Sequence, residues 1–167
     1  MLDWALDQDK HPVYIAIPSG PVVHAEGSVR TNFDALNTYE VTREGSKVAV
    51  LALGDFYDLG EKTVEALSST LGIEATLVKP YFASGVDQNL LDNLVKDHDV
   101  IVTIEDGIIE GGWGQNIASY LGTSSARVLN YGVKKAFYDR VNIADLMRES
   151  HLEPELITAD VKQVLGL

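Results

Sequence analysis

Two adjacent carboxylates followed by a group of glycines are the residues of this chain whose types and spacing could do chemistry. Glu105 and Asp106 come directly after an apolar run, residues 100–104, that is typical of a buried strand. Open α/β sheets place their sites at the carboxyl ends of strands, so this pair could act as a general acid and base. A glycine-rich helix start can also hold a phosphate with free backbone N–H groups. The glycines that follow the carboxylates are Gly111, Gly112 and Gly114.

Charge argues against a phosphate at these glycines. The positive end of a helix favours an anion by only about 0.3–1 kcal/mol. Residues 103–125 contain no Lys or Arg but include Glu105, Asp106 and Glu110, and one carboxylate about 4 Å from a phosphate costs on the order of 4 kcal/mol at an effective dielectric of about 20. The Gly-Gly-x-Gly spacing also fits neither the dinucleotide fingerprint nor the P-loop.

We therefore expect the glycines to permit positive φ angles and a close approach of the helix to a neighbouring backbone. The two carboxylates then either cap the following turn or lie, with the glycines, at a contact with another domain or subunit. An acid/base role for the pair stays open as the alternative.

The surrounding elements alternate between strand and helix, which predicts a three-layer α/β/α fold around a mostly parallel open sheet of about five strands. The expected strands are residues 39–43, 47–53, 73–78, 100–104 and 127–130. The expected helices are residues 58–71, 89–96, 115–121, 143–149 and 154–164. Residues 39–43 are expected to be an antiparallel edge strand that pairs, through a turn at residues 44–46, with the strand at 47–53.

The first residues of the chain look like an incomplete domain. Residues 1–8 are typical of the last turns of a helix, and residues 13–17 of a strand that ends at a Pro-Ser-Gly-Pro sequence. One short helix and one strand cannot bury themselves, so we expect the rest of this domain to lie outside the chain. The predicted boundaries are 1–21 for this piece, 22–37 for a linker and 38–167 for the main domain.

Composition excludes several classes of function. The chain has 25 acidic and 13 basic residues and a net charge of −12, which argues against binding to nucleic acid or to an anionic membrane. It has no cysteine, and its four histidines lie far apart, so no metal site is predicted. No apolar run approaches the roughly 18 residues of a membrane span, and no signal peptide is recognisable, so a soluble cytoplasmic protein is expected. His98 and His151 are expected at the surface near helix ends.

Four short sequences occur in the order that one known family shows. They are residues 77–80 (Leu-Val-Lys-Pro), 102–107 (Val-Thr-Ile-Glu-Asp-Gly), 111–114 (Gly-Gly-Trp-Gly) and 128–132 (Val-Leu-Asn-Tyr-Gly). Together they resemble the C-terminal domain of the transketolase superfamily, and within it the deoxyxylulose phosphate synthases. Residues 1–4 and 11–20 are similar to the last helix and strand of the pyrimidine-binding domain that precedes it in that family.

The resemblance implies the activity of an intact parent enzyme. In that family pyruvate is decarboxylated on thiamine diphosphate, and the two-carbon unit is joined to glyceraldehyde 3-phosphate. The N-terminal and pyrimidine-binding domains, which we expect to be missing here, hold thiamine diphosphate and Mg²⁺. The resemblance therefore implies that this chain has no catalytic, cofactor-binding or metal-binding residue of its own, and that it packs against those domains and stabilises a homodimer.

One departure from the family concerns the substrate phosphate. Many members have a Tyr-Pro-Arg-Gly sequence whose Arg meets the phosphate, and Ser19 stands at that position here. A serine hydroxyl can donate one hydrogen bond but lacks the charge and the two-pronged geometry of Arg. We expect the parent to be a divergent paralogue, or to use Arg30, Arg43 or a residue outside the chain instead.

Two other functions stay open. The chain could be the C-terminal domain of another superfamily member, such as the β subunit of a 2-oxoacid dehydrogenase, or a separate small-ligand binding module of flavodoxin-like shape. A group of basic and aromatic residues is expected to form either a subunit contact or a solvated loop. Its members are Lys134, Lys135, Arg140, Tyr131, Phe137 and Tyr138.

Overall fold

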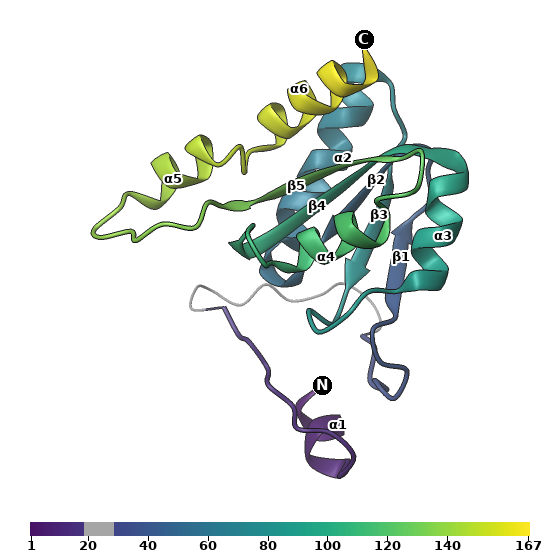
Figure 1. Cartoon of the computed structure of the whole chain (residues 1–167), viewed down its shortest axis with the longest axis vertical. Coiled ribbons are helices and arrows are strands. Elements are labelled where there is room, and N and C mark those ends of the chain that lie inside the picture. Colours follow the sequence, from purple (N-terminus) through teal and green to yellow (C-terminus); the bar gives the residue numbers. More distant parts are fainter. Residues whose placement is uncertain (19–28) are drawn as a thin grey trace. The chain divides into compact units, whose positions relative to one another are not determined.

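The computed structural model describes residues 1–18 and 29–167, which fall into two compact units, Met1–Leu36 and Asn37–Leu167 (Figure 1). In the part of the chain so described, no helix is long and apolar enough to cross a membrane.

The larger unit is built on a five-stranded sheet with the order β1-β3-β2-β4-β5. The strands are β1 (Tyr39–Arg43), β2 (Lys47–Ala52), β3 (Thr76–Pro80), β4 (His98–Ile108) and β5 (Arg127–Val133). Strand β2 pairs in parallel with β3 and β4, and β4 pairs in parallel with β5. Only β1 among these strands runs antiparallel, on β3 at one edge. The predicted fold class, a mostly parallel sheet with one antiparallel edge strand, is confirmed.

Helices cover both faces of this sheet (Figure 1). The helices of this unit are α2 (Tyr57–Leu71), which follows a short 3-10 turn η1 (Gly54–Phe56), and α3 (Gln88–Asp97), α4 (Trp113–Tyr120), α5 (Ile143–Glu149) and α6 (Pro154–Leu165); α5 lies beyond the sheet. Val48 and Val50 of β2 pack in one apolar cluster with residues of α2 and α6. The intervening Ala49 and Leu51 pack in a second cluster with residues of α3 and α4. Because successive strand residues point to opposite faces, β2 is the centre of a three-layer fold.

The predicted pairing of β1 with β2 through a hairpin is wrong. Every residue of β2 after Lys47 is buried, which suits a central strand with a parallel neighbour on each side. The expected turn instead lies against the segment before β3. Ser46 donates its backbone N–H to the Glu74 carbonyl at 2.9 Å, and a Cβ on Gly45 would come within 2.2 Å of the same oxygen.

Strand β4 is longer than predicted and contains both Glu105 and Asp106 rather than ending before them. The extension is stabilised by pairing with β5, since Ile108 lies opposite Val133 beyond an irregularity in the register. Helix α4 begins at Trp113, two residues earlier than the sequence pattern indicated. The two carboxylates and the helix start are therefore brought closer together than the sequence suggested.

The smaller unit contains helix α1 (Leu2–Asp7), as predicted. Trp4 of this helix meets Phe33 edge to face and donates its indole N–H to Asp34 at 2.8 Å, so residues 29–36 fold back on the helix. Residues 13–17 were predicted as a strand but form none here. A strand needs a neighbouring strand to hold its backbone hydrogen bonds, and the described residues of this unit offer none. Residues 19–21 of the Pro-Ser-Gly-Pro sequence and residues 22–28 of the predicted linker lie outside the described residues.

Candidate functional site

The predicted carboxylates lie where the connections of the sheet diverge. Strand β2 leads through α2 to β3 on one side, and β4 leads through α4 to β5 on the other. The carboxyl ends of β2 and β4, which are neighbours, therefore form the switch point at which open α/β sheets commonly bind ligands. Asp55 follows β2 at this place, and Glu105 and Asp106 are near the end of β4.

Glu105 is buried and caps helix α4. Only 6% of the residue is exposed. Its Oε2 accepts the backbone N–H of Trp113 and its Oε1 that of Gly114, both at 2.9 Å. A carboxylate at a helix N-terminus satisfies backbone donors that have no partner within the helix and also meets the positive end of the helix dipole. The prediction that this carboxylate caps the segment after it is confirmed.

The glycines make room for this carboxylate. A Cβ on Gly112 would lie 2.5 Å from the Ile108 carbonyl oxygen and 2.6 Å from Glu105 Oε1. A Cβ on Gly114 would lie 2.3 Å from Thr103 Oγ1. Gly111 has a φ of +81°, which residues with a side chain rarely adopt. The predicted positive φ is confirmed at Gly111 and the predicted close backbone approach at Gly112, whereas Gly114 meets side-chain atoms instead of a backbone.

A phosphate has no place at this helix start, since Glu105 already holds its first N–H groups. The same bonds engage both oxygens of Glu105, and the residue is buried, so its carboxylate is held against the helix and away from solvent. Asp106, by contrast, is exposed. Its pKa is raised, first by partial desolvation and then by the negative charge of Asp55. Within the described ranges no three His, Cys, Asp or Glu side chains are grouped so as to hold a metal ion.

A buried hydrogen-bond chain that the sequence did not reveal links α4 to the β1 edge. Trp113 donates its indole N–H to the Tyr39 hydroxyl at 3.0 Å, and that hydroxyl donates to the Gly85 carbonyl at 3.0 Å. Burial raises the pKa of Tyr39 to about 12. On the other side of α4, Thr103 donates to Asn130 Oδ1 at 2.7 Å. Trp113 lies before the helix predicted from the sequence, residues 115–121, so the sequence did not indicate this bond.

Two expectations for single side chains are corrected. His98 is 8% exposed and not at the surface, because its ring lies between the Leu94 carbonyl (2.8 Å) and Thr76 Oγ1 (2.7 Å) and joins α3, β3 and β4. Tyr131 is also buried and donates to Asp160 Oδ2 at 3.0 Å, so it does not belong to an exposed aromatic group. His151 is exposed, as expected.

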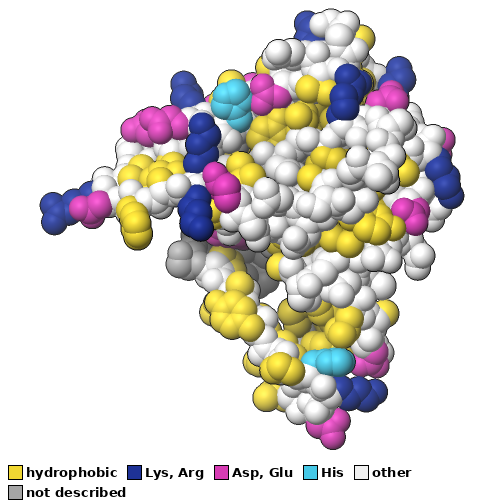
Figure 2. Space-filling view, in the orientation of Figure 1, with side chains coloured by type: hydrophobic (Ala, Val, Ile, Leu, Met, Phe, Trp, Pro, Cys, Tyr) yellow, Lys and Arg dark blue, Asp and Glu magenta, His cyan; other side chains and the backbone are white. Residues whose placement is uncertain are grey.

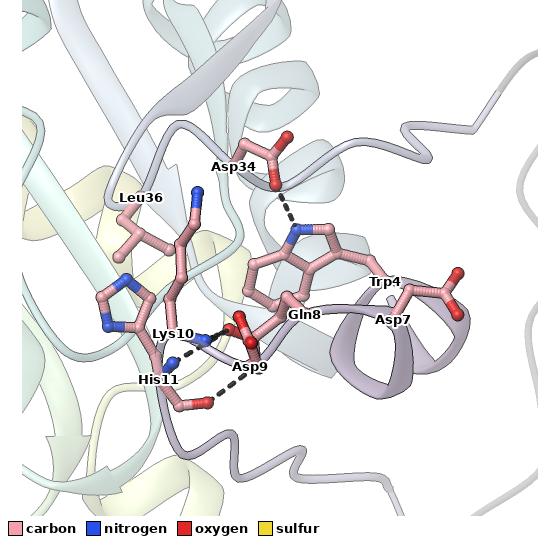
Figure 3. Close-up of a pocket in the computed structure, with 8 residues that line it drawn as sticks. All are labelled: Trp4, Asp7, Gln8, Asp9, Lys10, His11, Asp34 and Leu36. Carbon is pink, nitrogen blue, oxygen red and sulfur yellow. Dashed lines mark hydrogen bonds between the residues drawn. The ribbon is translucent and has the colours of Figure 1, made fainter.

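The smaller unit has a pocket of about 270 Å³ that the sequence did not indicate (Figure 3). It is lined by Trp4, Asp7, Gln8, Asp9, Lys10, His11, Asp34 and Leu36. Figure 3 shows that Gln8 bonds to the backbone of Lys10 and His11, and that Trp4 bonds to Asp34. The hydrogen bonds from Trp4 and then Asn32 lower the pKa of Asp34. The polar groups that line this pocket thus hold the turn after α1 together. Their arrangement suggests no reaction. Ser19, the predicted substrate-phosphate position, lies outside the described residues.

Comparison with known proteins agrees with this geometry. The family described as "Transketolase, C-terminal domain" matches residues 37–157. The 1-deoxy-D-xylulose-5-phosphate synthase of Pseudoalteromonas translucida is 35% identical over 157 residues, which cover 93% of this chain and 24% of that protein. The synthase of Clostridium tetani is 26% identical over 172 residues, covering 99% of this chain and 26% of that one. The chain thus spans about a quarter of the length of the curated relatives it matches.

A solved structure supports the same assignment. A split-gene transketolase described as an inactive β4 tetramer superposes with a TM-score of 0.69 at 25% identity, over 78% of this chain and 43% of that one. A transketolase of Pichia stipitis (TM-score 0.52, 15% identity, 77% of this chain and 18% of that one) shows the fold alone. The family match covers most of the chain and all five strands of its sheet. The chain belongs to the transketolase C-terminal domain family.

Proposed function

We propose that the chain is the C-terminal region of a 1-deoxy-D-xylulose-5-phosphate synthase, where it packs against the cofactor-binding domains and supports a homodimer. The observation that carries the proposal is Glu105. At the start of α4, next to the place where an open α/β sheet would bind a ligand, the chain's own carboxylate accepts the backbone N–H groups of Trp113 and Gly114 at 2.9 Å. Because these donors are already bonded, they are not available to an anionic ligand, which favours a supporting role. The relatives named above favour this parent over a 2-oxoacid dehydrogenase.

In this proposal thiamine diphosphate and Mg²⁺ bind to other domains of the parent. The residues described here do not fit either group: they provide no metal-ligand cluster, and the helix start most suited to a diphosphate already holds a carboxylate. The parent would convert pyruvate and glyceraldehyde 3-phosphate in the cytoplasm, and this chain alone would be inactive.

We further propose that the first residues are the end of a pyrimidine-binding domain, with boundaries near 1–21, 22–37 and 38–167. Residues 13–17 support this because they have a strand-type sequence and pair with no strand among the described residues of the chain. Tyr14 is 92% exposed and Ile17 is 82% exposed. A neighbouring sheet supplied by the preceding part of the enzyme would bury these side chains. In the same proposal, Ser19 in place of an Arg weakens recognition of the substrate phosphate.

The residues proposed to lie at a domain or subunit contact, at the end of β4 and in the loop before α4, differ in how exposed they are. Asp106 and Gly111 are exposed and can touch a neighbouring domain. Glu105 and Gly114 are buried, and Gly112 is close to Glu105, so these three would act by fixing the shape of the loop.

A chimera tests the proposal. The C-terminal quarter of the Pseudoalteromonas translucida synthase is replaced by residues 1–167, and formation of deoxyxylulose phosphate from pyruvate and glyceraldehyde 3-phosphate is measured. We expect an active chimera and an inactive isolated chain. The control is the synthase truncated at the same junction, which should be inactive. Turnover of pyruvate by the isolated chain, or a folded chimera no more active than the truncation, would overturn the proposal.

A further inference from the structure

Side-chain hydrogen bonds gather at the first residues of the larger unit. This unit begins at Asn37, and its first strand begins at Tyr39. Tyr39 lies opposite Pro80 of β3, and a proline has no backbone N–H to donate to a neighbouring strand. This end of the edge strand therefore lacks a donor from its neighbour, and other groups of the larger unit hold it.

The loop between β3 and α3 holds Tyr39 at two places. Asp87 Oδ2 accepts the backbone N–H of Tyr39 at 2.9 Å. The other oxygen of Asp87 accepts the backbone N–H of Leu90 at 3.0 Å and so caps α3. The Tyr39 hydroxyl donates to the Gly85 carbonyl at 3.0 Å. Both the backbone and the side chain of Tyr39 are thus bonded to the segment that leads into α3.

The same loop holds Asn37, where the chain turns into β1. Asn37 has a φ of +57°, in the left-handed region that Asn adopts more readily than most residues. Ser84 donates its hydroxyl to Asn37 Oδ1 at 3.1 Å. A Cβ on Gly85 would lie 2.6 Å from Asn37 Nδ2, so the missing side chain at Gly85 makes room for the amide. The turn is therefore determined by a side-chain bond together with a close contact.

Trp113 holds the Tyr39 side chain from helix α4. Its indole N–H donates to the Tyr39 hydroxyl at 3.0 Å, and the two rings meet edge to face with their centroids 5.9 Å apart. Trp113 is itself fixed, since it is 3% exposed and its backbone N–H is bonded to Glu105 Oε2 at 2.9 Å. The start of β1 is therefore connected to the buried carboxylate at the end of β4.

We propose that these groups act as a clamp that fixes the direction in which the chain enters the larger unit. The residues of the clamp are Asn37, Tyr39, Ser84, Asp87 and Trp113. An edge strand is bonded on one side only, so its first residues would fray without such support. With the clamp closed, the predicted linker joins the sheet at a rigid point. The inference goes beyond the proposed function and does not depend on it, because every residue of the clamp belongs to the larger unit.

The clamp should be insensitive to salt. Many charged side chains on the face drawn in Figure 2 lie near its outline, where water and ions screen them. Within the clamp only Asp87 is charged, and it is half-buried and bonded to two backbone N–H groups. The remaining bonds join neutral groups, so added ions have little charge to screen.

NMR of the backbone amides of the full chain tests the clamp. We expect order parameters near 0.85 for Asn37 and Tyr39, the value of a rigid backbone, at both low and high salt. Tyr39→Phe keeps the ring and removes both bonds of the hydroxyl. The amide of residue 39 should then exchange with solvent about tenfold faster or more, relative to that of Val50 in the central strand. Ser84→Ala, at an exposed position, should lower the order parameter of Asn37 and leave the core unchanged.

Tyr120→Phe is the matched control. Tyr120 of α4 donates its hydroxyl to Asp92 at 2.9 Å, outside the clamp, so the same chemical change should leave the amides of residues 37–39 as they are. Order parameters below about 0.6 for Asn37 and Tyr39 in the wild-type chain, or a fall on addition of salt, would overturn the inference. So would an equal effect of Tyr120→Phe, or exchange at residue 39 that Tyr39→Phe leaves unchanged relative to Val50.

A loss of order throughout the sheet in both Tyr39→Phe and Ser84→Ala would also overturn the inference, because these bonds would then support the core and not the entry of the chain. The activity of the chimera does not enter this experiment, so the proposed function is tested separately.

Discussion

Replacing Glu105 with Gln should destabilise the larger unit by about 2–4 kcal/mol. The carboxylate accepts two backbone N–H groups at 2.9 Å, and hydrogen bonds to a charged group contribute about 1.5–3 kcal/mol each. Gln keeps one acceptor oxygen but turns its NH₂ group toward the other N–H, so one bond is lost and two donors face each other. Loss of the charge removes a further 0.3–1 kcal/mol or so of attraction to the helix N-terminus. The change in volume is negligible, which excludes a cavity as the cause.

The assay is urea unfolding followed by far-ultraviolet circular dichroism, with the free energy of unfolding taken from the midpoint and slope. Glu110→Gln is the matched control. Glu110 is exposed and accepts one backbone N–H, from Lys135 at 2.8 Å, so its change should cost about 1 kcal/mol or less. Equal losses in the free energy of unfolding for both variants, or a loss of less than about 0.5 kcal/mol for Glu105→Gln, would show that the Glu105 carboxylate does not stabilise the start of α4.

Rescue by a small anion makes the test sharper. Glu105→Ala leaves both N–H groups without an acceptor, and formate has the size and charge of the missing carboxylate. Formate should therefore stabilise Glu105→Ala, by about 2.7 kcal/mol at one hundred times its dissociation constant, and leave the wild-type chain unchanged. A general salt effect would stabilise both proteins equally, and that result would contradict the reasoning.

Three further predictions follow from single contacts. Gly114→Ala should destabilise the unit by about 2–4 kcal/mol in urea unfolding, because its Cβ would lie 2.3 Å from a buried hydroxyl. Gly122→Ala is the control and should cost at least about 1 kcal/mol less, since its Cβ would meet its nearest atom at 3.4 Å. Burial raises the pKa of Tyr39 to about 12, so its contribution to stability is complete below pH 10 and is lost as the pH rises through 12; Tyr39→Phe should flatten the fall of the unfolding midpoint across that range. Trp4→Phe removes the indole donor that lowers the pKa of Asp34, so an NMR titration of that carboxyl should show its pKa rising toward the ordinary value.

Local sequence signals predicted the elements of the larger unit well. Helix α2 has an amphipathic pattern and a glycine, Gly72, just after it, and the structure gives that glycine a φ of +66° at the helix end. Helix α6 begins at Pro154, whose ring suits the first turn of a helix. Such signals depend on neighbouring residues alone, so no tertiary contact is needed to interpret them.

Pairing between distant segments was not predictable in the same way. The sequence of β1 is suited to an edge strand, but β1 pairs with β3 and not with β2 because both edges of β2 are already paired, with β3 and with β4. The sequence of residues 13–17 is suited to a strand, and a strand does not form without a neighbour. His98 looks like a surface residue in sequence because its partners, at Leu94 and Thr76, become neighbours only once α3, β3 and β4 are packed.

The two adjacent carboxylates at the switch point have different roles, since Glu105 stabilises the fold and Asp106 is exposed at the proposed contact. Glu105 points inward and neutralises the start of α4, which leaves no positive helix end to attract a phosphate or a carboxylate ligand. Asp106 is exposed, and its pKa is raised first by partial desolvation and then by the negative charge of Asp55. An anion approaching this end of the sheet therefore meets repulsion without the usual compensation from helix N–H groups. Cations are favoured there instead, in a chain whose net charge is −12.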